Sequence, residues 1–315
     1  MKRSIGLFVL AAAALVFPLV VSHPYVRHVF IVMLIWATLG VAWNILGGYA
    51  GQVSLGHAAF FGVGAYTAGL LATKAGVSPW WGMLLGPIVA TVIALPIGAI
   101  AFRLRGPYFA LGTLALGEMF YIVFNNWTEV TNGARGILLM PAFTDKLPYA
   151  YLALFMLALA LATSEALRRS KAGFYFVAVR EDEDAAAALG IPTARVKMLA
   201  LLVSAFLTGL AGAFYMNYVS FIDPATVFSL SNVSIMIILV VMLGGVATLF
   251  GPVVGAVVYI GLNELLRSSL GSANALVFGL LVIAVIVFLP NGLVGSVHFR
   301  RRPAAEREGV RHGAA

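Results

Sequence analysis

Long apolar runs separated by short polar connections make up most of this chain. Each run holds about 17–22 residues, enough for an α-helix to cross a hydrocarbon core of about 30 Å. The pattern predicts an all-α fold: a polytopic transmembrane helical bundle of about ten spans, within a range of about 8–10. The predicted spans are Ser4–Val21, Val29–Leu46, Val53–Thr73, Gly82–Phe102, Tyr108–Phe124, Tyr149–Leu167, Met198–Val219, Asn232–Phe250, Pro252–Leu266 and Ala273–Leu289.

Two stretches fit a regular spanning helix poorly. Pro252–Leu266 is short and ends beside charged residues, so a re-entrant segment is an alternative there. Gly47–Gln52 is rich in glycine, which disfavours helix by about 1 kcal/mol per residue relative to alanine. Irregular backbone at membrane depth is tolerated only where protein or a water-filled cavity covers it, so we expect any break there to be covered.

A short internal echo relates two glycine-rich stretches. Gly47–Ala50 opens the third span, and Gly244–Ala247 precedes the ninth. Many transporters are built from internal repeats. Four small residues also recur by chance in a chain rich in glycine and alanine, so both interpretations stay open.

Composition supports the membrane assignment. Hydrophobic residues make up 62% of the 315 residues and charged residues only 10%, whereas soluble chains carry about 25% charged residues. The absence of cysteine excludes a disulfide framework and a thiolate metal site. The net charge of +8 fits cytoplasmic loops rich in Lys and Arg better than a nucleic-acid surface, so we expect no nucleic-acid partner.

The basic residues also predict an orientation. An even number of spans puts both termini on one side, and placing them in the cytoplasm leaves 5 of the 20 Lys and Arg residues outside and 15 inside. We predict an N-terminal transmembrane helix and outer loop over 1–28, the helix being retained, not cleaved as a signal peptide. The main transmembrane domain covers 29–295, with a cytoplasmic loop at 168–197, and a basic cytoplasmic tail covers 296–315. The outside residues are Arg27, Lys74, Arg135, Lys146 and Arg267.

Catalytic arrangements find little support. Ser54 and His57 lie three residues apart and can share a helix face, but no third orienting group is near and Ser54 is not in a Gly-x-Ser-x-Gly context. The histidines are scattered and no His-Glu-x-x-His occurs, so no metal site is predicted. No nucleotide-binding motif appears either, so we expect no bound cofactor. An intramembrane hydrolase stays a distant alternative.

A proton- or sodium-coupled carrier is the stronger alternative. Such carriers need ionisable groups at mid-membrane, where an unpaired charge is costly. Glu118 is the clearest of these, while Glu165 and Glu264 fall near span ends, where snorkelling accounts for them. Glu118 is either a functional group on a pathway or a carboxyl bonded to a neighbouring helix. A single carboxylate gives ion coupling weak support.

The most informative polar stretch is 179–197. Acidic residues precede an alanine run there, which favours a short helix with anions at its positive N-terminus. Gly190 is a suitable C-cap, and Pro192 prevents the helix from continuing. The result is a short exposed helix that suits the groove of a motor protein. A solvated loop helix without a partner is the alternative.

At these residues the chain resembles a known family. The acidic-Ala-Ala-Gly stretch is similar to the coupling motif of permeases in ATP-binding-cassette (ABC) importers, although it begins Glu183-Asp184-Ala185-Ala186, so its register is approximate. Three further stretches, 44–66, 105–128 and 243–252, resemble the LivM type of branched-chain amino acid permease. The resemblance covers roughly residues 30–295. Urea, amide and some sugar importers use related permeases and remain alternatives.

The resemblance implies a transport subunit in the bacterial inner membrane, not an enzyme. Its partners would be a second permease of the LivH type, two cytoplasmic ATPases that bind the ATP, an external solute-binding protein and membrane lipid. Residues 168–197 would then hold the coupling loop, and the outer loop Asn125–Pro148 is a candidate dock for the binding protein. The implied coupling residues are Glu183, Asp184, Ala185, Ala186, Ala187, Leu189 and Gly190.

Chemistry suggests a substrate pathway as well. Neutral hydrogen-bonding side chains in or beside apolar spans suit a zwitterion that carries an apolar side chain. The alternative is that they join helices across the bundle. The pathway candidates are Asn44, Gln52, Ser54, His57, Thr113, Glu118 and Asn125.

Overall fold

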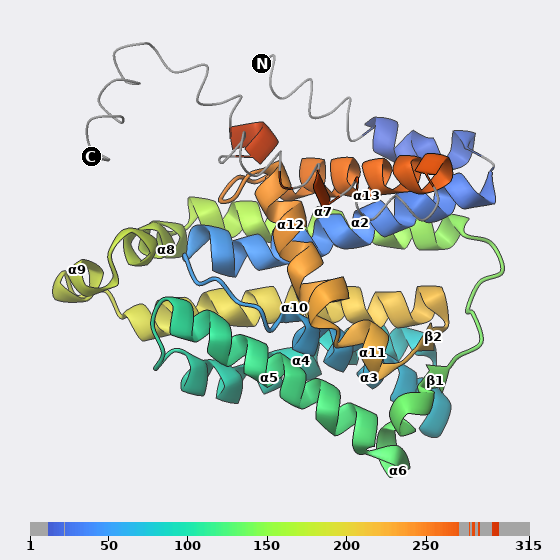
Figure 1. The fold of residues 1–315 in the computed structure, drawn as a ribbon, viewed down its shortest axis with the longest axis horizontal. Coiled ribbons are helices and arrows are strands. Elements are labelled where there is room, and N and C mark those ends of the chain that lie inside the picture. The colour runs from blue at the N-terminus through green and yellow to red at the C-terminus, as the bar shows by residue number, and fades with distance from the viewer. Residues whose placement is uncertain are drawn as a thin grey trace.

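The computed structural model of the chain describes residues 12–21, 23–270, 277, 279, 280, 283 and 292–295. Long helices lie side by side, and α8 and α9 project at one end of the bundle, opposite β1 and β2 (Figure 1). The elements are α2 (Pro24–Asn44), η1 (Ile45–Tyr49), α3 (His57–Lys74), α4 (Pro79–Ala101), α5 (Pro107–Asn126), α6 (Thr128–Thr131), η2 (Gly133–Arg135), β1 (Ile137–Leu138), α7 (Leu147–Arg169), α8 (Lys171–Glu181), α9 (Glu183–Ala188), α10 (Thr193–Val219), β2 (Phe221–Ile222), α11 (Pro224–Val227), η3 (Leu230–Ile235), α12 (Met236–Gly244) and α13 (Gly251–Leu270).

The helical membrane bundle is confirmed. Six helical segments among the described residues are long and apolar enough to cross a membrane. The predicted spans at the two ends of the chain are described only in part: residues 12–20 of Ser4–Val21 are helical, and little of Ala273–Leu289 is described. The six segments are Pro24–Tyr49, Pro79–Ala101, Pro107–Asn126, Leu147–Arg169, Thr193–Val219 and Pro224–Gly244.

Three predicted spans have different limits in the structure. The third begins at His57 rather than Val53, because residues 50–56 leave the helix, with Gly51 at a φ of 70°. The eighth begins earlier, at Pro224, and ends at Gly244, because Gly245 has a φ of 127°. The segment expected over Pro252–Leu266 is a longer continuous helix, α13, which packs along α2.

Close backbone contacts hold α3, α4 and α10 together. A Cβ atom on Gly64 of α3 would lie 2.1 Å from the carbonyl oxygen of Gly209 in α10. A Cβ on Gly209 would in turn lie 2.5 Å from Ala90 Cβ in α4. Without a hydrophobic driving force inside lipid, small residues stabilise helix pairs by letting their backbones approach. The glycines of these apolar helices therefore form the packing core.

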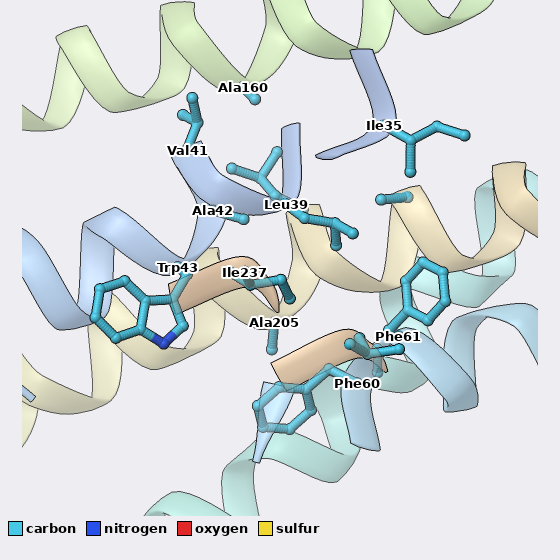
Figure 2. Packing of buried hydrophobic residues seen from close by; sticks show 14 of the residues in the cluster. Ile35, Leu39, Val41, Ala42, Trp43, Phe60, Phe61, Ala160, Ala205 and Ile237 are labelled. Carbon is cyan, nitrogen blue, oxygen red and sulfur yellow. The ribbon is translucent and has the colours of Figure 1, made fainter. Parts of the chain in front are cut away.

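Larger apolar side chains fill the space between this core and α2. Ile35 and Leu39 of α2 lie near Phe61 of α3, Ala205 of α10 and Ile237 of α12 (Figure 2), and all five are buried. Helix α2 also packs against α7 and α13. One contiguous buried cluster thus joins most of the described long helices.

Helix α5 is the exception. Only 17% of its apolar window is buried, against 72% for Pro24–Tyr49. Its buried residues are Phe109, Thr113 and Gly117, which lie at intervals of four along one line. The described chain therefore leaves most of the surface of α5 uncovered.

Candidate functional site

Helix α9 is the short exposed helix that the sequence predicts. Its N-terminus is capped by Asp182, whose side chain accepts hydrogen bonds from the N–H groups of Asp184 and Ala185, each at 2.9 Å. Gly190 follows the helix with a φ of 82°, and the Gly190 and Ile191 N–H groups bond back to carbonyls of the last turn. In Figure 1 α9 lies at the outer tip of its end of the bundle. The predicted end of the helix at Gly190 is confirmed.

The acidic residues of this helix are bonded within the chain. Glu183 pairs with Lys197 of α10 at 2.6 Å, and Asp184 pairs with Arg105, between α4 and α5, at 2.9 Å. Ala186 is also buried against the chain. The remaining predicted coupling residues, Ala185, Ala187, Leu189 and Gly190, are exposed.

Leu189 dominates the outward surface of α9. Its side chain is 83% exposed, an unusual state for a large apolar residue beyond the end of a spanning helix. The exposed positions next to it in the chain, 187, 188 and 190, carry only alanine or glycine. The structure thus presents Leu189 as a small apolar knob on a capped helix, and ion pairs of Glu183 and Asp184 hold this helix to the bundle.

A break in the chain between α2 and α3 is the second feature. Residues 50–56 run without helix between η1 and the start of α3. Side chains satisfy their backbone: Leu55 N–H donates to Thr113 Oγ1 at 3.0 Å and Gly56 N–H to Ser54 Oγ at 3.2 Å. Trp43 Nε1 donates to the Ser54 carbonyl at 2.8 Å. The expected irregular segment is present and is covered partly by protein.

Asn44 joins the two glycine-rich stretches of the internal echo. Its amide nitrogen donates to the Thr248 carbonyl at 2.9 Å, and its oxygen accepts from Ala247 N–H at 2.8 Å. A Cβ on Gly48 would lie 2.9 Å from Ala247 N and 2.0 Å from Asn44 Oδ1. The two stretches therefore pack against each other, and Asn44 is the connection between them.

His57 lies at the start of α3 and is fully buried. Ser204 Oγ donates to the Ala42 carbonyl at 2.7 Å, so it accepts from His57 Nε2, which lies 2.8 Å away. These two bonds link α3, α10 and α2. Because His57 bonds to Ser204 and not to Ser54, the Ser54–His57 pair considered from the sequence is not formed.

The predicted pathway residues therefore divide into two groups. Asn44, Ser54, His57 and Thr113 are buried and hydrogen-bonded within the chain, in positions that join helices. Gln52, Glu118 and Asn125 retain exposed surface. The recess beside Ser54 and Thr113 has room for no more than about one water molecule.

Glu118 lies on the uncovered side of α5. It shares an exposed line at helical spacing with Leu111, Ala115 and Ile122, and it has no hydrogen-bonding or ion-pair partner among the described residues. A carboxylate at the centre of a span facing lipid costs about 2.5–3.5 kcal/mol on insertion scales. This face therefore suits contact with another protein or with water better than contact with lipid.

The opposite end of the bundle carries a small platform. β1 pairs antiparallel with β2, so that Ile137 faces Ile222 and Leu138 faces Phe221. Leu138 is 75% exposed and the nearby Met140 is 88% exposed. The long connection after α5 is thus ordered by pairing and presents apolar side chains outward.

Sequence reasoning missed the partners that hold these features. By sequence alone Lys197 and Arg105 are two of the basic residues on the cytoplasmic side, and only the structure shows that they pair with Glu183 and Asp184. Ser204 and Ser234 were hidden in apolar runs, although Ser234 Oγ accepts from Ala58 N–H at 3.0 Å and satisfies the first turn of α3. The hydroxyl groups inside the apolar spans were the signal that could have identified Ser204 and Ser234 as helix-joining residues, because such groups require a hydrogen-bonding partner in the bundle.

Comparisons with known proteins agree with this architecture. Residues 25–289 match the family described as branched-chain amino acid transport system / permease component. The chain is 29% identical to the high-affinity branched-chain amino acid transport system permease protein LivM of Salmonella typhimurium, over 93% of this chain and 75% of that protein. It is 23% identical to LivH of the same organism, over 86% and 93%. It is also 29% identical to the autoinducer 2 import system permease protein LsrC of Enterobacter sp., over 60% and 58%.

Proposed function

The chain belongs to the family of permease components of branched-chain amino acid transport systems, and on that premise we propose that it is a membrane subunit of an ABC importer for leucine, isoleucine and valine. It is a multi-pass protein of the bacterial inner membrane and a transport subunit, not an enzyme. The observation that carries the proposal is the similarity to LivM over 93% of the chain. ATP is bound by partner subunits.

A second permease completes the membrane part of the proposed importer. Similarity to both LivM and LivH indicates that the two permeases share one fold. Two related chains can pair about a pseudo-twofold axis, with equivalent surfaces meeting. The uncovered side of α5, with Glu118 in an apolar line, is the surface that such a partner would cover.

The translocation pathway in this proposal runs along that shared face. Gln52 in the irregular segment, Glu118 on α5 and Asn125 at its end offer polar groups there, and unwound backbone at membrane depth commonly lines a transport route. The buried candidates Asn44, Ser54, His57 and Thr113 act by holding helices together in the conformation described. Selectivity resides largely in the solute-binding protein, which docks on the platform formed by β1, β2 and the loop before α7.

Charge distribution supports the proposed orientation, with ten spans and both termini in the cytoplasm. In this topology 29–295 form the permease domain, 168–197 its coupling loop, 1–28 the first helix and outer loop, and 296–315 the tail. Basic residues crowd the end of the bundle that carries α8 and α9, as the positive-inside rule requires of a cytoplasmic face. Those described at that end are Arg103, Arg105, Arg168, Arg169, Lys171, Arg180, Arg195 and Lys197.

Energy enters the proposed importer through α9. The exposed Leu189 knob inserts into a groove of an ATPase subunit, and closure of the two ATPases moves α9 against the bundle. The permeases then switch between inward- and outward-facing states by rigid-body rearrangement. A stand-alone carrier would have no use for a capped apolar knob held clear of the bundle.

Uptake by the reconstituted complex tests this function. We expect proteoliposomes that hold the chain, the second permease and the ATPases to accumulate labelled leucine when ATP and the loaded binding protein are supplied. A proton ionophore should leave the rate unchanged, and unlabelled isoleucine and valine should compete. Competition by urea, amides, sugars or autoinducer 2 instead would assign the importer a different substrate. Autoinducer 2 is included because LsrC is among the similar proteins. Uptake without ATP would reject the importer.

A further inference from the structure

Lys197 is the one Lys, Arg, Asp or Glu in the described part of the chain whose side chain is buried; it is 2% exposed. Its Nζ lies 2.6 Å from Glu183 Oε1 and 5.3 Å from the centre of the Phe102 ring. A buried ammonium requires a counter-charge, because leaving it unpaired exacts a large desolvation penalty. Glu183 is therefore firmly tied to α10.

The second ion pair of α9 is of a different kind. Asp184 and Arg105 are 76% and 66% exposed, and they join α9 to the turn between α4 and α5. Pairs in water are screened and contribute little to holding two elements together. Of the two ion pairs of α9, the one at Glu183 is therefore firm and the one at Asp184 is loose.

The firm attachment leads to the centre of the bundle. Helix α10 packs against α3 and α4 through close glycine contacts. Its Ser204 accepts from His57 of α3 and donates to Ala42 of α2. A displacement of α10 is therefore passed directly to three other helices, whereas Arg105 lies in the turn between α4 and the lightly packed α5, and its pair with Asp184 is exposed.

We propose that the Glu183–Lys197 pair is the mechanical joint that passes movement of α9 to α10, and that Glu183 is not a contact for the ATPase. This inference rests on the proposed function, since it assumes that an ATPase moves α9. Glu183 is a positioning residue in this scheme: it acts through Lys197, behind the surface that carries Leu189.

The test separates docking from transmission in the complete importer. The double variant Glu183→Gln, Lys197→Met removes both charges together, since an apolar replacement of a whole buried pair is often tolerated. We expect the ATPases to co-purify as with wild type, while leucine taken up per ATP hydrolysed falls at least about tenfold. The control Glu181→Gln, two residues away in an exposed pair, should stay within about twofold of wild type. Loss of ATPase co-purification, or wild-type uptake per ATP, would overturn the proposal.

A reversible crosslink gives a second, independent measurement. The chain contains no cysteine, so the variant Glu183→Cys, Lys197→Cys can be joined by a cleavable thiol-specific crosslinker. Uptake per ATP should rise when the two positions are joined and fall again after cleavage. Equal uptake per ATP in the crosslinked and the cleaved state would contradict the proposal that this pair transmits movement. If wild-type complex shows no ATP-dependent uptake at all, the proposed function fails instead, and the two failures are distinct.

Discussion

Replacing Asp184–Leu189 by a Gly/Ser linker of equal length is expected to reduce ATP-driven leucine uptake to background. Each alanine exchanged for glycine disfavours helix by about 1 kcal/mol. A helix as short as α9 is only marginally stable, so it is expected to unfold after several such exchanges. The apolar knob at Leu189, 83% exposed, disappears as well. The measurement is uptake into proteoliposomes that contain all partner proteins.

The same variant should insert and fold normally. The exchanged stretch lies outside the helices long enough to cross a membrane, and Glu183 remains to pair with Lys197. Membrane content and thermal unfolding of the purified variant check this point. The control Leu189→Met conserves an apolar knob of similar volume, an exchange that usually costs less than about 1.5 kcal/mol, and should retain uptake. Wild-type uptake by the linker variant would remove α9 from the coupling mechanism.

Gly64→Ala is expected to lower the yield of folded protein sharply. The added Cβ would lie 2.1 Å from the Gly209 carbonyl oxygen and 2.7 Å from Gly209 Cα. Backbone atoms cannot turn aside as a flexible side chain can, so α3 and α10 must move apart. Overpacking of this kind costs typically about 1–3 kcal/mol. The measurement is the midpoint of thermal unfolding in detergent, together with the amount recovered from membranes.

Gly261→Ala is the matched control for this contact. Gly261 also lies inside a long apolar helix, α13, but a Cβ there meets only the end of the Met33 side chain at 3.4 Å. Alanine should be tolerated, with helix stabilised by about 0.5–1 kcal/mol where no other contact opposes it. Equal effects of the two substitutions would show that close approach of α3 and α10 does not control folding.

Local sequence signals predicted the local structure well. The acidic residues at the start of α9 and the glycine that follows it act within one helical turn, so the sequence contains these signals directly. The predicted start of α3, at Val53, is too early, because residues 53–56 continue the apolar run although their backbone is not helical. The turn at Gly51 and the bond from Leu55 to Thr113 decide that boundary.

Local sequence signals could not predict the contacts between distant parts of the chain. Asn44 is a pathway candidate or a helix-joining residue by its sequence, and the structure shows that it bonds to Ala247 and Thr248, about 200 residues away, through a pairing that no local pattern encodes. The resemblance implies Glu183 and Asp184 as coupling residues, and the structure shows that both also bond within the chain. Charge patterning shows that Glu183 needs a partner, but only packing shows that the partner is the buried Lys197.

Crosslinking from Leu189 to an ATPase subunit tests the central claim most directly. Because the chain lacks cysteine, a Leu189→Cys variant carries a single thiol at the tip of α9, and Leu138→Cys places one at the opposite end of the bundle. In membranes containing the full complex we predict that a thiol-activated photocrosslinker joins position 189 to the ATPase and does not do so from position 138. An ATPase adduct from position 138, or none from position 189, would contradict the account.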